Sequence, residues 1–309
     1  MEGFIDFKTI KSLALELGFQ DCGAIKSKKI DISFFSEWLN KGYNANMQYM
    51  QNYIEKRENP SLLLENSKSI ISFIVSYNTE TIDNMTNNPL KFASYSLFED
   101  YHKSIKIALY KLISCIQEIY PDFKAIPYVD SAPLFEKLIA KEAGLGWIGK
   151  NSCLINKYYG SKILIGEIIT NYSTDYNTII QEDNCKECSN CIDNCPNKAI
   201  NDDKSINANL CSSYQTIENK DNISNTINLK SYIFGCDICL NSCPWNSNKK
   251  IKSSKILSLN TNMQNLIDRI NEERFDKTLF NKVKKNSAIE RIKFEKLLSN
   301  IEKAKGEII

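Results

Sequence analysis

The sequence predicts a mixed protein of the α+β or α/β class, built in three parts. Strand-like and helical patterns alternate over residues 1–175, eight of the 11 cysteines fall within residues 185–243, and residues 249–309 carry helical patterns with many basic side chains. These observations predict an α/β domain over residues 1–175, a cysteine-rich module over 176–248 and a short basic helical segment over 249–309.

The first part alternates between the two secondary-structure periods. Apolar residues at helical spacing followed by Gly18 predict a helix over residues 7–18. The β-branched and aromatic run Ser69–Tyr77 predicts a buried strand. The same criteria predict strands at 21–26 and 123–129, helices at about 32–40, 100–120 and 134–143, and a hairpin that joins 152–156 to 162–170 around Gly160.

A glycine-rich loop follows the helix predicted at residues 134–143. Gly144, Gly146 and Gly149 fit the pattern G-x-G-x-x-G, but a dinucleotide site needs a strand before this pattern and a helix after it. The loop is therefore not predicted to bind a dinucleotide. Beyond the cysteine-rich module, helices are expected over residues 263–280 and 287–301, and Ser287 with Glu290 predicts a capping box.

The cysteines form two runs with a single cysteine between them. The run from Cys185 to Pro196 reads C-x2-C-x2-C-x3-C-P, the bacterial ferredoxin signature, in which the fourth cysteine serves the other cluster. The second run lacks one cysteine, and Cys211 is the natural replacement. Two [4Fe–4S] clusters in a ferredoxin-like module are therefore expected. The crossing rule assigns Cys185, Cys188, Cys191 and Cys243 to the first cluster and Cys195, Cys211, Cys236 and Cys239 to the second.

Other uses of these cysteines fit the pattern less well. Zinc favours paired C-x2-C motifs and has little use for a third cysteine followed by C-P. Disulfides need an oxidising compartment, and residues 1–30 show no signal peptide. No apolar run reaches the length of a membrane span, so no membrane partner is expected. Free thiols and the expected iron–sulfur clusters place the protein in a reducing cytoplasm.

The net charge of +2 hides an asymmetry along the chain. Residues 249–309 carry 15 Lys and Arg against 8 Asp and Glu, whereas residues 1–248 carry 24 against 29. A basic segment on an acidic body suggests an anionic partner such as a nucleic acid. The alternative is a solvated helical surface in a lysine-rich chain, and charge alone favours that alternative because the patch is diffuse.

Three residues stand out as candidates for chemistry. Asp130 ends a predicted strand beside the glycine loop, where catalytic carboxylates are common, although an Asp there also caps helices. Arg57 is the only arginine before residue 269. In a chain that otherwise uses lysine, this suggests a role that needs the planar guanidinium, whereas the alternative is a plain surface charge. His102 is the only histidine, and we interpret it as a hydrogen-bonding residue at a helix start.

Two clusters imply one-electron steps, so a second cofactor that acts on a substrate is expected. Flavin and cobalamin are the candidates. The motif in which a protein histidine binds cobalt needs D-x-H-x-x-G, and Ile105 stands where that glycine belongs. Any cobalamin would therefore have no histidine ligand from this chain.

The motifs together resemble the epoxyqueuosine reductases, the cobalamin- and iron–sulfur-dependent enzymes of tRNA queuosine synthesis. The resemblance covers most of residues 10–300. The stretches that carry it are Asp100-Tyr-His102; Val129–Pro133 with Glu136 and Lys137; Ala143–Asn151; Gly160-Ser161 with Gly166-Glu167; Ser213-Tyr214 with Thr216–Glu218; and Gly235–Asn246.

The resemblance implies a chemistry and a set of residues. Base-off cobalamin would lie between the α/β domain and the ferredoxin-like module, and electrons from an external low-potential donor of the ferredoxin or flavodoxin type would reach it through the clusters. The epoxide in the anticodon loop would open and water would leave. Asp130 would be the proton donor, which requires a protonated carboxyl that burial against the corrin could provide.

The resemblance also assigns binding residues and an expected monomer. The residues expected near cobalamin are Arg57, Asp130, Lys150, Asn151, Ser213 and Asp237. The basic segment would hold tRNA phosphates, with Lys284, Lys285, Arg291 and Lys293 as the expected contacts.

The chain departs from the family pattern in two places. At Tyr95–Glu99 the family usually has Tyr-Ala-Arg-Gly, so an arginine expected near the substrate is missing. Many members also carry a longer C-terminal helical array, so the grip on tRNA is expected to be weaker or built differently. Two other functions stay open at this point: another cobalamin and iron–sulfur reductase, such as a reductive dehalogenase, and a ferredoxin-like electron carrier.

Overall fold

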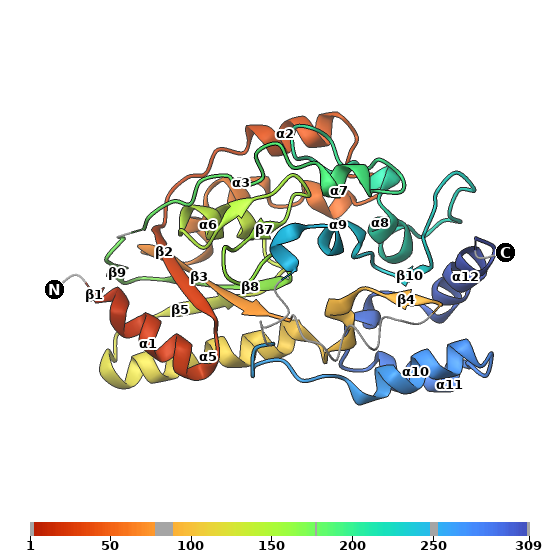
Figure 1. Cartoon of the computed structure of the whole chain (residues 1–309). Coiled ribbons are helices and arrows are strands. Elements are labelled where there is room, and N and C mark those ends of the chain that lie inside the picture. The colour runs from red at the N-terminus through yellow and green to blue at the C-terminus, as the bar shows by residue number, and fades with distance from the viewer. Residues whose placement is uncertain (1–2, 78–88, 177, 248–252, 308–309) are drawn as a thin grey trace.

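The computed structural model describes residues 3–77, 89–176, 178–247 and 253–307. A four-stranded antiparallel sheet lies at its centre, with strands in the order β2-β3-β8-β5 (Figure 1). These strands are β2 (Asp21–Lys26), β3 (Ser69–Ser76), β8 (Ile163–Thr170) and β5 (Ala125–Tyr128). The boundary predicted between residues 248 and 249 lies outside the described residues.

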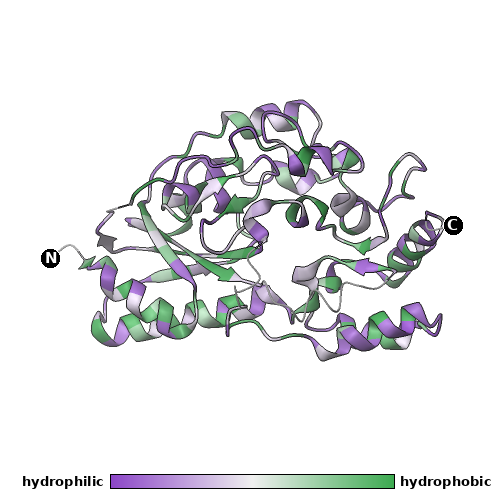
Figure 2. Cartoon of the chain, viewed as in Figure 1, coloured by the Kyte–Doolittle hydropathy of each residue, from purple (hydrophilic) through white to green (hydrophobic). Residues whose placement is uncertain are grey.

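Strand β3 is buried on both faces, as its continuous apolar run predicts. Ile71, Phe73 and Val75 point into the larger core with the helices α1 (Phe7–Leu17) and α5 (Tyr101–Ile119), while Ile70 and Ile74 join the core under α6 (Glu136–Glu142). Figure 1 shows α1 and α5 on one side of the sheet and α6 on the other. Hydrophobic residues accordingly line the strands and the inward faces of both long helices (Figure 2).

The predicted hairpin around Gly160 is wrong. Strand β7 (Leu154–Ile155) pairs with β6 (Trp147–Ile148), whereas β8 lies between β3 and β5. Only an isolated bridge between Asn156 and Gly160 closes the turn. The reason is burial, because β8 covers more apolar surface by pairing along all eight residues of β3 than by pairing with the short β7.

The cysteine-rich module is tied to the α/β part by backbone pairing. Its strand β10 (Tyr232–Phe234) runs parallel to β4 (Lys91–Phe92), and the Trp38 indole donates a hydrogen bond to the Ile206 carbonyl at 2.7 Å. The remaining elements of these two parts are short. They are β1 (Phe4–Ile5), α2 (Ser33–Asn40), α3 (Ile54–Glu58), β9 (Ser173–Thr174), α7 (Asn190–Asp193), α8 (Ser212–Ile217) and α9 (Ile238–Asn241).

The C-terminal segment folds into α10 (Thr261–Asn271), α11 (Lys277–Lys284) and α12 (Phe294–Lys305). The single helix predicted over residues 263–280 is wrong, because Asp276 caps a new helix by accepting the Leu279 N–H at 2.8 Å. The predicted capping box is also not formed. The Ser287 hydroxyl donates to the Lys284 carbonyl at 3.4 Å instead, and only a short 3-10 turn, Ala288–Arg291, follows.

One hydrophobic core joins the three parts of the chain. It contains Ile5, Phe73 and Ile105 from the first part, Ile233 from the cysteine-rich module and Leu297 from α12. None of the described helices combines the length and the apolar character needed to cross a membrane.

Candidate active site and cysteine groups

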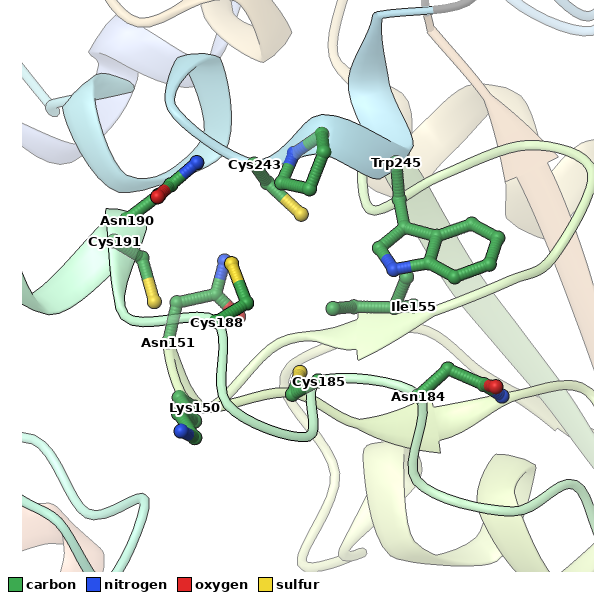
Figure 3. Close-up of a pocket in the computed structure, with 11 residues that line it drawn as sticks. Lys150, Asn151, Ile155, Asn184, Cys185, Cys188, Asn190, Cys191, Cys243 and Trp245 are labelled. Carbon is green, nitrogen blue, oxygen red and sulfur yellow. The ribbon is translucent and has the colours of Figure 1, made fainter.

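The first cysteine group surrounds a pocket in the cysteine-rich module. Cys185, Cys188, Cys191 and Cys243 all line it, with Trp245 on one side (Figure 3). The first three come from the chain that leads into α7 and from α7 itself, and Cys243 follows α9, which packs against α7. The structure therefore brings together the four cysteines that the crossing rule assigns to the first cluster.

The second group consists of Cys195, Cys211, Cys236 and Cys239. Burial raises the pKa of the Cys236 thiol to about 12, and the charges of Cys211 and Cys195 add to the effect. Burial also raises the pKa of Cys239, which feels the charges of Cys236 and Cys211. These four thiols thus lie within electrostatic reach of one another. The thiol charges that raise the pKa of Cys243 come instead from Cys185, Cys191 and Cys188, which keeps the two groups separate.

The donor sets fit four-iron clusters better than single metal ions. Four thiolates around one zinc ion, each about 2.3 Å from the metal, lie only about 3.8 Å apart. Within the described ranges no three His, Cys, Asp or Glu side chains are grouped to hold one ion. A cubane cluster needs four thiolates around one centre, and the four cysteines that line this pocket provide that number.

Lys150 and Asn151 lie beside the first cysteine group. Both line its pocket, and the Asn151 side chain is buried with its Nδ2 atom unpartnered. A buried amide donor without a partner costs free energy, so this atom suits a ligand that accepts a hydrogen bond. Ser213 lies at the second group, where its backbone N–H favours the Cys211 thiolate.

Asp237 lies between Cys236 and Cys239 of the second cysteine group and contacts Ser94 of the first part of the chain. It is 2% exposed and accepts hydrogen bonds from the Ser94 backbone N–H at 2.6 Å and from the Ser94 hydroxyl. Burial raises the pKa of the neighbouring Tyr95, and the charges of Asp237 and Asp130 raise it further. The Tyr95 ring, next to Ser94 in the chain, packs against the Tyr101 ring at 5.9 Å, and the Tyr101 hydroxyl lies 3.3 Å from Asp130. A short series of contacts therefore connects Asp237, at the second cysteine group, with Asp130.

Asp130 is held at the start of a strained turn after β5. Its backbone is left-handed, with φ 58°, and its N–H donates to Glu136 Oε1 at 2.5 Å. Its carboxylate Oδ2 lies 3.0 Å from His102 Nε2 and 3.3 Å from the Tyr101 hydroxyl. The side chain stays 61% exposed, so a substrate can reach it.

The His102 contact sets the charge of the Asp130 side chain. A hydrogen bond from His102 holds the pKa of Asp130 below its usual range, although burial opposes this. Burial lowers the pKa of His102, but hydrogen bonds to Asp130 and Asp100 outweigh it and raise the pKa overall. Without cobalamin, these pKa directions favour the proton on His102 rather than on Asp130. The expectation that burial against the corrin protonates Asp130 concerns the cobalamin-bound protein and stays a prediction.

His102 is a candidate site residue that the sequence alone indicates only as a hydrogen-bonding residue at a helix start. It does lie at a helix start, where the Asp100 side chain caps its N–H, but its ring also bridges Asp100 (2.8 Å) and Asp130 (3.0 Å). One signal in the sequence could have indicated this role: the only histidine of the chain lies two residues after the helix-capping Asp100. Contact with Asp130, 28 residues away, needed the packing of α5 against β5.

Two arginines contact aromatic rings near this site. The Arg57 guanidinium lies 5.8 Å from the Phe35 ring and 6.0 Å from the Phe135 ring, and burial lowers its pKa. Arg291 lies over Tyr49 at 5.6 Å and pairs with both carboxylate oxygens of Glu218 at 2.7 and 3.1 Å.

The charge of Arg291 contributes to lowering the pKa of Asp130. The C-terminal segment thus brings an arginine over Tyr49, paired with Glu218, in a chain that lacks the arginine expected before Asp100. The three lysines expected to bind tRNA lie on the same segment, Lys284 at the end of α11 and Lys285 and Lys293 in the connection to α12.

Comparisons with known proteins agree with this arrangement. Residues 57–131 match the family model described as epoxyqueuosine reductase QueG, DUF1730, and residues 184–246 match the 4Fe-4S double cluster binding domain. An epoxyqueuosine reductase of Cyclobacterium marinum is 36% identical over 302 residues, which is 96% of each chain.

Solved structures have the same fold. The structure of epoxyqueuosine reductase from Streptococcus thermophilus matches with a TM-score of 0.84 and 27% identity, over 98% of this chain and 81% of that one. A crystal structure of epoxyqueuosine reductase with an epoxyqueuosine-modified tRNA-Tyr stem loop matches with a TM-score of 0.80 and 23% identity, over 97% and 81%. On the extent and identity of the match to the curated relative, the chain belongs to the epoxyqueuosine reductase family of oxidoreductases.

Proposed function

We propose that this protein reduces epoxyqueuosine to queuosine in the anticodon loop of tRNA. The observation that carries the proposal is the series of contacts that connects Asp130, paired with His102, through Tyr101 and Tyr95 to the Ser94–Asp237 contact at the second cysteine group. The Asp130–His102 pair could supply protons, and the second cysteine group could carry electrons, within the same part of the molecule. A plain electron carrier needs no such acid beside its clusters.

Two [4Fe–4S] clusters would be held by the two cysteine groups. Cobalamin, in the base-off form, would lie between the N-terminal part (1–175) and the ferredoxin-like module (176–248), near Arg57, Asp130, Ser213 and Asp237. When bound, cobalamin would supply a strongly reducing cobalt centre for the reaction at the epoxide carbon. Lys150 and Asn151 line the pocket of the first cysteine group, where the unpartnered Asn151 Nδ2 favours a bound acceptor. A contact of these two residues with cobalamin is proposed on the family resemblance alone.

The chain's own residues would manage the proton. His102 holds a proton within 3.0 Å of the Asp130 carboxylate, so the pair together can deliver one proton to the opening epoxide oxygen. Asp100 fixes the imidazole by accepting from its Nδ1 atom at 2.8 Å. Asp130 remains the proposed catalytic residue because it is the exposed member of this chain of groups.

The partners follow from this chemistry. An unstacked anticodon base would reach Asp130 past Tyr49 and Arg291, since RNA loop bases are commonly read against aromatic rings and arginine planes. Lys284, Lys285, Arg291 and Lys293 on the C-terminal segment (249–309) would approach the phosphates. We expect an external low-potential donor of the ferredoxin or flavodoxin type, a cytoplasmic location and a monomer.

The test is turnover by the Asp130→Asn variant. Asn keeps the shape and a hydrogen-bond acceptor but cannot pass on an acidic proton, so kcat is expected to fall by roughly 10²–10⁴-fold. Conversion of an epoxyqueuosine-modified stem loop would be followed by mass spectrometry of digested nucleosides, with anaerobic protein loaded with iron and cobalamin. Asp122→Asn is the matched control, because Asp122 is exposed and precedes β5, whereas Asp130 follows it.

Two results would contradict the proposal. Full turnover by Asp130→Asn with normal cobalt content would remove Asp130 as the proton donor. Wild-type protein that carries iron and cobalt but converts only organohalides, and not the stem loop, would transfer the assignment to a reductive dehalogenase.

A further inference from the structure

A buried network of hydrogen bonds lies behind the second cysteine group, with Thr216 of α8 at its centre. The Thr216 hydroxyl accepts the backbone N–H of Gly235 at 2.9 Å and donates to the carbonyl of Ser212 at 2.9 Å. Ser212 directly follows Cys211 in the chain, and Gly235 directly precedes Cys236. One buried hydroxyl therefore joins the two chain segments that carry these cysteines.

The Asn197 side chain brings the segment of Cys195 into the same network. Asn197 lies two residues after Cys195, and its Nδ2 atom donates to the Ser212 hydroxyl at 2.8 Å and to the Asn228 carbonyl at 3.0 Å. The Ser212 hydroxyl donates to the same carbonyl at 3.0 Å. Three of the four cysteines in the second group therefore lie within two residues of a member of this network.

Asn300 of α12 joins the network from the C-terminal segment. Helix α12 packs against both α8 and β10 (Figure 1). The Asn300 Nδ2 atom donates to the carbonyl of Thr216 at 2.8 Å and to the carbonyl of Ile233 at 2.9 Å. The first carbonyl belongs to α8, which follows Cys211, and the second belongs to β10, which precedes Cys236. One side chain of α12 therefore fixes α8 and β10 relative to each other.

The burial of Asn300 has a cost that an apolar residue would avoid. Its Oδ1 atom is buried without a partner, which is unfavourable for an amide oxygen. The other buried residues of α12 are apolar, namely Leu297, Ile301 and Ala304. An apolar side chain at position 300 would continue this face but would give the carbonyls of Thr216 and Ile233 no donor. The asparagine is therefore suited to hold these two carbonyls in place rather than to fill the core.

The backbone just before Cys236 has little freedom to adjust. Gly235 has a left-handed backbone with φ 68°, and a Cβ atom at this position would meet the Ala93 Cβ at 2.5 Å. The Gly235 N–H is the group that the Thr216 hydroxyl accepts. Loss of that hydroxyl would leave a buried N–H unpaired at a tight turn, and any shift that relieves this would move Cys236.

We propose that Thr216 and Asn300 are positioning residues for the second [4Fe–4S] cluster, so that the C-terminal segment completes the site of that cluster. The inference rests on the proposed assignment of the second cysteine group to one cluster. A four-iron cluster needs its four thiolates around one centre at the same time, and groups that orient metal ligands commonly change metal affinity by about 10–100-fold. Of the described residues that line the pocket of the first cysteine group, none belongs to this network, so only the second cluster should respond.

Two variants remove the hydrogen bonds with little change in side-chain volume. Thr216→Val replaces the hydroxyl with a methyl group, and Asn300→Leu removes the amide donor. Thr216→Ser keeps the hydroxyl and is the conservative variant that should behave as wild type. Glu302→Gln, at an exposed position of α12, is the matched control for a change on this helix.

The experiment measures the release of iron from anaerobic holoenzyme to excess bathophenanthroline disulfonate. In Thr216→Val and Asn300→Leu, about four of about eight irons are expected to leave about 10–100-fold faster than in wild type, while the rest leave at the wild-type rate. Thr216→Ser and Glu302→Gln should release all their iron at the wild-type rate. This readout requires no turnover, so it does not depend on the proposed reaction.

Three results would overturn the inference. The first is release from Thr216→Val and Asn300→Leu that is as slow as from wild type. The second is release from Thr216→Ser that is as fast as from Thr216→Val. The third is equally faster release of all the iron, with a lower unfolding temperature, which would assign the network to general stability. Thr216→Val alone decides the outcome if Asn300→Leu is not recovered in folded form.

A Cys211→Ser variant tests the ligand assignment separately. It should bind about four irons, because one of two four-iron clusters loses a ligand. About eight irons in this variant would remove the proposed assignment of the second group. The expected loss in Cys211→Ser together with wild-type release from Thr216→Val would remove the positioning role alone.

Discussion

At the residue scale, the chemistry of the site depends on which of two neighbouring groups carries a proton. The contact between His102 Nε2 and Asp130 Oδ2, at 3.0 Å, favours a cation on the ring and a carboxylate on the aspartate. A carboxylate by itself is a poor acid at neutral pH. The His102–Asp130 pair is a better acid than the carboxylate alone, because the pair still holds a proton at pH values below the pKa of the histidine.

A His102→Gln variant should move the pH dependence of the reaction. The pKa of His102 is raised, so the charged pair is intact below about 6.5, the ordinary histidine value, and is lost as pH rises through the higher pKa of the folded protein. On the acid side, the lowered pKa of Asp130 keeps the carboxylate charged, and the pair is lost as pH falls through that pKa.

Without the imidazole, the proton must sit on Asp130 alone. Its pKa then lies nearer the ordinary value, so the alkaline limb of kcat/KM should move to lower pH by at least about one unit. Measurement of kcat/KM across pH for both proteins checks this. An alkaline limb that stays at the wild-type pH would show that His102 does not share the catalytic proton.

At the element scale, two short helices decide which cysteines meet. The packing of α7 against α9 brings Cys243 to the pocket of Cys185, Cys188 and Cys191, although 40 residues separate Cys195 of the first run from Cys236 of the second. Cys153, on the loop before β7, lies close enough to Cys211 to feel its charge, yet it belongs to neither motif run.

Iron content should separate ligand cysteines from a bystander. Cys243→Ser is expected to lower bound iron from about eight to about four per chain, because one of two four-iron clusters loses a ligand. Cys153→Ala, the matched control, should keep about eight irons. Iron and sulfide assays on anaerobic protein decide the matter, and iron loss in the Cys153 variant would mean that the ligand set differs from the one proposed.

At the scale of the whole molecule, the site is assembled from all three parts of the chain. Arg291 from the C-terminal segment pairs with Glu218 of the cysteine-rich module and lies over Tyr49 of the first part. The shared core has members from the same three parts. The C-terminal segment is therefore packed into the body of the molecule and is more than an appended basic surface.

Removal of three lysines should weaken tRNA binding in a salt-dependent way. For Lys284→Ala, Lys285→Ala and Lys293→Ala combined, the slope of log affinity against log salt should fall by about 0.7–0.9 for each lost phosphate contact. Binding of the stem loop at several salt concentrations measures this slope. Lys8→Ala, exposed on α1 at the opposite end of the molecule in Figure 1, is the control. An unchanged slope in the triple variant would place the phosphates elsewhere.

The sequence by itself determined the features that depend on local pattern. It located β2, the long helix α5 and the glycine end of α1 within a residue or two, because side-chain periodicity and caps are local properties. It also placed the eight cysteines into two groups, since the spacing of a ferredoxin motif already encodes the crossing of ligands.

Only the tertiary structure decided features that depend on distant partners. The pairing of β8 with β3 rather than β7, the division of the helix predicted at 263–280, and the contacts of His102, Arg291 and Asn300 all join residues far apart in the chain. Burial is the physical reason: the side chain that desolvates a carboxyl, or the strand that covers an apolar face, is chosen by packing, and packing cannot be read from local spacing.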